Sequence, residues 1–158
     1  MGNKGNGIWD ELEGVKESLT DEVEIKFGDV EVELEVRFIE AGDILEINQE
    51  YDEKKPAKPE IKLPGYGKIK IPNKDYKKFD DHEKAQEWYE KCKPIERERK
   101  IRLAYEFLTD EFKPDEDYKK GIKILDERLR EIDIANIVNA GLRLSGFLNK
   151  EREQEKDS

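Results

Sequence analysis

Apolar and charged residues alternate strictly along two neighbouring runs near the start of the chain, residues 23–27 and 30–38. The apolar members are Val23, Ile25, Phe27, Val30, Val32, Leu34, Val36 and Phe38. A period of two places these side chains on one face of a strand and the charges on the other. Gly28-Asp29 separates the runs and predicts a two-residue hairpin loop, because glycine accepts the positive φ that such a turn requires.

The two-residue loop also sets the register of the predicted hairpin. It places Phe27 opposite Val30, Ile25 opposite Val32 and Val23 opposite Leu34. Each apolar side chain is worth about 1.5–3 kcal/mol when buried, and a slip of one residue would expose them all. We therefore expect the whole apolar face, including Val32 and Leu34, to lie in the core.

Apolar residues at helical spacing predict a short amphipathic helix on each side of the hairpin. The helix before it is interrupted by Gly14 and follows residues 1–7, which we expect to be mobile. The helix after it runs from about Ala41 and ends before Lys54. The apolar residues of the first helix are Ile8, Trp9, Leu12, Val15 and Leu19.

A capping box and a proline divide the next helical stretch into two predicted helices. Asp80 and Glu83 have the spacing of a capping box, and Pro94 predicts a new helix start, where its missing amide costs nothing. The apolar face of the helix before Pro94 contains Ala85, Trp88, Tyr89 and Cys92. The apolar face of the helix after Pro94 contains Ile101, Leu103, Ala104, Tyr105, Phe107 and Leu108.

Two further helices are predicted after Pro114, the first capped by Asp115 and the last running from about Asp133 to a stop at Gly146. A narrow heptad-like seam joins Tyr118, Ile122, Leu125, Leu129 and Ile132. In the last helix we expect a core face of Ile134, Ile137 and Val138. The fold class is therefore α+β, with a small antiparallel sheet built on the N-terminal hairpin and packed against several C-terminal α-helices.

Composition and charge add one asymmetry to this picture. A chain of 158 residues predicts a single domain over residues 1–158, ending in a polar tail at 149–158 that we expect to fray. Residues 54–79 carry nine lysines against Glu60 and Asp75, which gives this segment a charge of +7. Because the net charge of the chain is −10, all other residues together carry −17. This Lys/Pro-rich basic arm contains a second, smaller hairpin in which Ile61 and Leu63 mirror Ile69 and Ile71. We favour a solvated, protruding segment over a functional patch.

The residues needed for catalysis are scarce. His82 and Cys92 are the only histidine and cysteine, and they fall on separate turns of one predicted helix. His82 with Asp80 and Asp81 is read as a helix start rather than a metal site, and Cys92 as a core residue. We therefore expect no enzyme, catalytic residue, cofactor, metal or small-molecule substrate. No membrane-length apolar run and no signal peptide are visible, which predicts a cytoplasmic protein without a membrane partner, and the mixed charges of the helices argue against nucleic-acid binding.

The order of elements and the closing sequence resemble a known family. The hairpin is followed by Ile44-Leu45-Glu46-Ile47 and a helical second half that ends in Gly141-Leu142-Arg143-Leu144-Ser145-Gly146-Phe147. This pattern is similar to the tail assembly chaperones of long-tailed bacteriophages and prophages. The resemblance implies a non-enzymatic protein that binds the tape measure protein, a long helical chain, keeps it soluble during tail tube assembly in the host cytoplasm, and self-associates.

The predicted partner-binding residues lie at the end of the last helix. Leu144, Phe147 and Leu148 add apolar surface beyond the core face, where an exposed anchor can serve a partner helix. An alternative from another class is an acidic inhibitor that imitates nucleic acid, or another small acidic interaction module. The carboxylates on the wet face of the hairpin support that alternative, and they are Glu22, Glu24, Glu31, Glu33 and Glu35.

Overall fold

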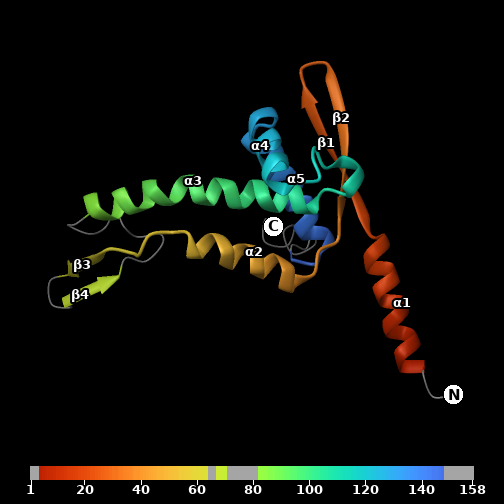
Figure 1. Cartoon of the computed structure of the whole chain (residues 1–158), viewed down its shortest axis with the longest axis horizontal. Helices are drawn as coiled ribbons and strands as arrows, with labels where there is room; N and C mark the ends of the chain where they lie inside the picture. The colour runs from red at the N-terminus through yellow and green to blue at the C-terminus, as the bar shows by residue number, and fades with distance from the viewer. Residues whose placement is uncertain (1–3, 64–66, 71–81, 148–158) are drawn as a thin grey trace, which may run out of the picture. The chain divides into compact units, whose positions relative to one another are not determined.

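The computed structural model describes residues 4–63, 67–70 and 82–147, and its elements are labelled in Figure 1. In chain order they are α1 (Lys4–Ser18), β1 (Thr20–Phe27), β2 (Val30–Arg37), α2 (Ala41–Glu53), β3 (Glu60–Leu63), β4 (Gly67–Lys70), α3 (His82–Phe107), the 3-10 turn η2 (Asp110–Phe112), α4 (Tyr118–Arg128) and α5 (Glu131–Leu144). The α+β fold class is confirmed, because a two-stranded antiparallel hairpin packs against C-terminal helices. The chain divides into two compact units, residues 1–45 with 100–158, and residues 46–99.

The predicted hairpin is confirmed in its loop and in its register. Strand β1 pairs with β2 so that Phe27 lies opposite Val30 and Val23 opposite Leu34. Gly28 has a φ of 59°, the left-handed value that a primed turn places at its first central residue. The alternation of apolar and charged residues was therefore sufficient to define the pairing.

The burial of the hairpin is only half as extensive as predicted. Val23, Ile25 and Val36 are buried, whereas Val30 and Val32 are exposed, with 43% of Val32 accessible. The expectation that Val32 lies in the core was therefore wrong. Leu34 is half-buried. Helix α5 packs on both strands, yet Phe27, Val30 and Val32 beside the loop keep apolar surface in solvent, while Ile25, which lies opposite Val32, is buried.

The core of the first unit is completed by the end of α3 and by two close helix contacts. Val36 of β2 forms an isolated antiparallel bridge with Leu108, just past the end of α3. A Cβ built at Gly141 of α5 would lie 2.2 Å from Cγ of Phe107, and one at Gly121 of α4 would lie 2.3 Å from the ring of Tyr105. Helices α4 and α5 therefore approach α3 at positions where only glycine fits.

Three predicted helix boundaries in this part of the chain were wrong. Helix α1 begins at Lys4, inside the segment expected to be mobile, and continues through Gly14. Helix α3 runs without interruption through Pro94. The predicted seam is broken after Arg128, where α4 ends and leaves Ile132 exposed.

The start of α4 also differs from its prediction. Asp117, rather than Asp115, is the N-cap, and its side chain accepts from the backbone N–H of Lys119 at 3.2 Å. Asp115 instead accepts from the N–H of Asp117 at 2.9 Å. The two carboxylates thus share the turn that leads into the helix.

The second unit contains the C-terminal part of α2, the N-terminal part of α3, and the small hairpin of β3 and β4. The second hairpin is present, with Ile61 paired with Ile69 and Leu63 paired with Gly67. Ile71 and the predicted Asp80 cap lie outside the described residues, as does the tail at 149–158. The single domain predicted for residues 1–158 stays a prediction, because α2 and α3 each continue from one unit into the other.

Candidate partner-binding surfaces

A buried carboxylate at the start of α5 joins that helix to the hairpin. Asp133 is 2% exposed and accepts three hydrogen bonds from Arg130: from the backbone N–H at 3.0 Å, from Nε at 2.9 Å and from Nη2 at 2.9 Å. Arg130 Nη2 also donates to the carbonyl of Lys26 at 2.7 Å, and its guanidinium lies 4.7 Å from the ring centre of Phe27. The hydrogen bonds from Arg130 hold the pKa of Asp133 below its usual range. This cluster is a structural joint, since its carboxylate is fully engaged within the protein.

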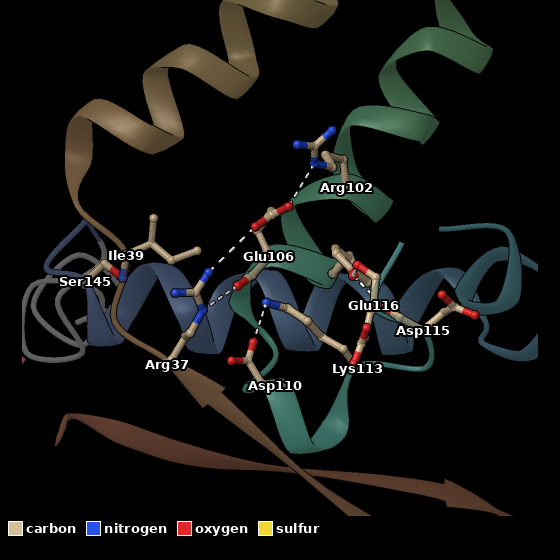
Figure 2. A network of polar contacts seen from close by, with 10 residues as sticks. Arg37, Ile39, Arg102, Glu106, Asp110, Lys113, Asp115, Glu116 and Ser145 are labelled. Carbon is tan, nitrogen blue, oxygen red and sulfur yellow. Dashed lines mark hydrogen bonds and ion pairs between the residues drawn. The ribbon is translucent and has the colours of Figure 1, made fainter. Parts of the chain in front are cut away.

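A second polar network, shown in Figure 2, joins β2 to the end of α3. Arg37 Nε donates to the carbonyl of Glu106 at 2.9 Å, and its guanidinium lies 3.6 Å from the carboxylate of that residue. Arg102 donates to the other oxygen of the carboxylate at 3.1 Å and lies over the ring of Tyr118 at 3.8 Å. These contacts fix the hairpin on the helices and leave the Glu106 carboxylate shared between two arginines.

Further contacts of the second network hold the end of α5 and the loop after α3 in place. The hydroxyl of Ser145 accepts from the backbone N–H of Ile39 at 3.0 Å (Figure 2). The hydroxyl of Tyr105 lies 2.6 Å from the carbonyl of Asp115, and Lys113 pairs with Asp110 at 3.2 Å. The hydrogen bonds of this network join β2, the end of α3 and the end of α5 to one another, which is the pattern of a structural joint.

Two titratable groups of α3 have a pKa that burial raises. Burial raises the pKa of the Cys92 thiol, which is the opposite of what a nucleophilic thiolate needs. Burial likewise raises the pKa of Tyr105. Among the described residues, no three His, Cys, Asp or Glu side chains are grouped so as to hold a metal ion. The prediction for His82 depended on Asp80 and Asp81, which lie outside those residues.

The second unit has its own ion-pair cluster, between α2 and α3. Lys55 pairs with Glu96 and, at 3.1 Å, with Asp52. Arg99 pairs with Glu96 at 3.0 Å and donates to the side-chain oxygen of Asn48 at 2.9 Å. Burial opposes the charge of Glu96, but the hydrogen bond from Lys55 and the charge of Arg99 outweigh it, so the pKa of Glu96 is lowered.

The beginning of the basic arm takes part in this packing. Lys54 lies 3.8 Å from Glu98, and Lys58 lies 5.8 Å from the ring centre of Trp88. Trp88 Nε1 donates to the carbonyl of Pro56 at 2.8 Å. The first five residues of the arm are therefore tied to α3. Whether the remainder protrudes stays a prediction.

The predicted partner-binding residues are only partly described. Leu144 is half-buried, Phe147 is 46% exposed, and Leu148 lies outside the described residues. A Schellman motif holds the backbone of Phe147, whose N–H donates to the carbonyl of Leu142 at 2.8 Å while the N–H of Gly146 donates to Arg143 at 3.1 Å. Gly146 has a φ of 89°, which confirms it as the stop of α5. Phe147 is thus an exposed ring on a fixed backbone.

An apolar surface larger than the ring of Phe147 lies on α1. The sequence predicted an amphipathic helix here but no partner site. Each of its apolar side chains is 36–65% exposed, and they are Ile8, Trp9, Leu12, Val15 and Leu19. The last turn of the helix is held by Lys16, which pairs with Glu40 at 3.2 Å, and by the carbonyl of Leu19, which accepts from the N–H of Phe38. The narrowness of the stripe was the available signal, because a core helix usually carries a broader apolar face.

The hairpin carries a second surface, apolar on one face beside the loop and acidic on the other face. Phe27, Val30 and Val32 are exposed on the apolar face. On the other face the register sets Glu22 opposite Glu35 and Glu24 opposite Glu33. Like charges directly opposite one another are destabilising, and the one lysine of this face, Lys26, lies 4.0 Å from Glu24 and 3.2 Å from Glu31.

Comparison of the chain with protein-family models, with curated proteins and with solved structures gave no match. No helix among the described residues is both long enough and apolar enough to cross a membrane.

Proposed function

We propose that this protein is a non-enzymatic binding module that holds a helical partner protein in solution. The observation that carries the proposal is the stripe of four apolar side chains on α1 and Leu19 directly after it, all 36–65% exposed. A fully buried side chain of this size is worth about 1.5–3 kcal/mol, so covering even part of the stripe is a substantial driving force for association. Amphipathic helices that lay an apolar face against a partner are a common mode of recognition.

The specific role we propose is that of a phage tail assembly chaperone. The partner is then the tape measure protein, a long helical chain whose apolar patches need cover while the tail tube polymerises, and copies of the chaperone also associate with one another. The resemblance of the closing stretch from Gly141 to Phe147 supports this role. The exposed ring of Phe147 is compatible with it, because its truncation would remove contact area without opening a core cavity.

Co-expression tests this role. The long helical protein encoded next to this one should stay soluble when both are made together and precipitate when made alone. Leu12→Asp should abolish this effect, whereas Leu45→Asp, the same change at an exposed leucine of α2, should not. Phe147→Ala should weaken capture with little loss of thermal stability. If the wild-type protein leaves the long neighbour insoluble, the chaperone role is wrong.

A second candidate function rests on the acidic face of the hairpin. The opposed pairs Glu22–Glu35 and Glu24–Glu33 form a row of carboxylates that can imitate phosphates and occupy a basic groove. A titration against a basic nucleic-acid-binding protein should then weaken steeply as salt rises, and Glu24→Gln with Glu33→Gln should weaken it further. A binding curve that does not change with salt would eliminate this function.

A further inference from the structure

We infer that α1 is a docking helix for a basic amphipathic helix of a partner protein, and that its own folding is completed by that partner. The inference rests on the proposed function in one respect, that the occupant is a helix. It adds the charge of the occupant, the face of α1 that it covers, and the coupling of binding to helix formation.

The spacing of the stripe selects a helix as the occupant. Ile8, Leu12, Val15 and Leu19 recur at intervals of four, three and four residues, which is the repeat of a seam between two helices. Trp9 stands beside the seam, 65% exposed. An edge strand would instead contact every second residue, and α1 does not present that period.

The charges beside the stripe select a basic occupant. From Gly7 to Glu22 the chain carries six exposed carboxylates, which belong to Asp10, Glu11, Glu13, Glu17, Asp21 and Glu22. Lys16 is the single cation of this segment, and it is already paired with Glu40 at 3.2 Å and Glu13 at 3.5 Å. A second copy would bring the same negative segment, and an anionic membrane surface would be repelled, so a helix with lysine or arginine beside its apolar stripe fits best.

The glycine content of α1 makes its folding depend on this cover. An isolated helix of about 15 residues is marginal in water, and a glycine within it is about 1 kcal/mol less favourable than alanine. Gly14 lies on the side of α1 away from the stripe, and nothing is within 4 Å of a Cβ built there. Alanine at this position would therefore stabilise the helix without touching the occupant, and through that stabilisation tighten binding by up to about fivefold.

Purified full-length protein and two labelled peptides test the inference. One peptide of about 18 residues places leucine at helical spacings of three and four residues and lysine at the positions between them, and the other replaces each lysine with glutamate. Fluorescence anisotropy should show binding of the lysine peptide and none of the glutamate peptide. Leu12→Asp should weaken binding at least tenfold, Leu45→Asp should leave it unchanged, and Gly14→Ala should tighten it severalfold while far-UV circular dichroism shows more helix. Glu11→Lys with Glu13→Lys changes the charge of residues 7–22 from −5 to −1 and should weaken binding of the lysine peptide.

Several results would overturn the inference. Equal binding of both peptides would show that charge does not select the occupant. Self-association that Leu12→Asp abolishes would identify a second copy as the occupant, and binding to anionic vesicles would identify a lipid surface. Unchanged helix content and unchanged affinity in Gly14→Ala would show that α1 is already folded before binding. If co-expression succeeds but the lysine peptide does not bind, the chaperone role stands and the assignment to α1 falls.

Discussion

Replacing Gly141 with alanine tests how closely α5 packs against α3. The added Cβ would lie 2.2 Å from Cγ, 2.3 Å from Cδ1 and 2.6 Å from Cδ2 of Phe107, whereas ordinary contact is 3.4–4 Å. The ring would have to move by more than 1 Å, and it is fully buried, with no exposed surface into which it could turn. Overpacking of this kind costs about 1–3 kcal/mol, and this clash belongs at the upper end because it falls on the ring atom nearest the backbone. Alanine returns about 1 kcal/mol as the better helix former, which leaves a net loss of about 2 kcal/mol.

Equilibrium unfolding in urea, followed by circular dichroism, measures this loss. With a slope of about 1–3 kcal/mol per molar, the midpoint should fall by roughly 1 M while the slope itself stays the same. Gly14→Ala is the matched control, because the same substitution in a helix meets no atom within 4 Å and should not lower the midpoint.

A second change distinguishes a steric clash from a general intolerance of substitution. Phe107→Leu removes ring atoms and should destabilise the protein alone, but combined with Gly141→Ala it opens the space that the new methyl group needs. The double variant should therefore be more stable than the sum of the two single losses predicts. Strict additivity, or a Gly141→Ala protein as stable as the wild type, would refute the close approach of α5 to Phe107.

Three further predictions concern the hairpin, α3 and the start of α5. Val23→Asp should cost several kcal/mol because Val23 is buried, whereas Val32→Asp should cost less than about 1 kcal/mol, and equal falls in melting temperature would contradict the half-covered hairpin. Pro94→Ala should raise stability by up to about 3 kcal/mol, since it restores the backbone hydrogen bond to the carbonyl four residues earlier, and a lower melting temperature would show that the proline is required. Asp133→Asn should cost about 1–3 kcal/mol at neutral pH, because a charged acceptor of the Arg130 hydrogen bonds is lost. The folded pKa of Asp133 lies below its usual 3.8, so this difference should persist above that value and disappear as pH falls through the folded pKa; a difference that grows in acid would refute it.

The hairpin was predictable from the sequence residue by residue, whereas its cover was not. Period-two alternation and Gly28-Asp29 determine pairing and turn, because both depend on local geometry. Periodicity identifies which face is apolar, but it does not report which residues of that face other elements cover. For this reason the outer residues Val30 and Val32 were assigned to the core and lie in solvent.

Helix boundaries failed where tertiary contacts override local signals. Pro94 is exposed, so its ring and missing N–H disturb α3 at one point, while the buried Ala85, Cys92 and Ile101 favour a continuous helix. The break before α5 has neither glycine nor proline to mark it. It is stabilised by the carboxylate of Asp133, which accepts from the backbone N–H of Arg130.

For the candidate surfaces too, the sequence pattern predicted the apolar face but not its exposure in the fold. The stripe on α1 was visible as an amphipathic face, but only the fold shows that no described element covers it. The C-terminal residues were proposed from a resemblance, and the Schellman motif at Gly146 and Phe147 followed from the glycine. Which of the two surfaces meets a partner depends on contacts with another molecule, which a single sequence does not record.

The joint between Arg130 and the hairpin has a consequence for how the chain is made. Arg130 and the Lys26 carbonyl that it contacts are 104 positions apart, and Ile39 and Ser145 are 106 apart. A ribosome adds about 5–20 residues per second, so the finished hairpin waits roughly 5 to 20 s after its emergence before α5 can cover it. During that interval Val23, Ile25 and Val36 face solvent beside the outer residues that never become buried. The nascent chain therefore passes through a stage in which the apolar face of its first hairpin is open to association, and the like-charged glutamates on the other face oppose the approach of a second hairpin.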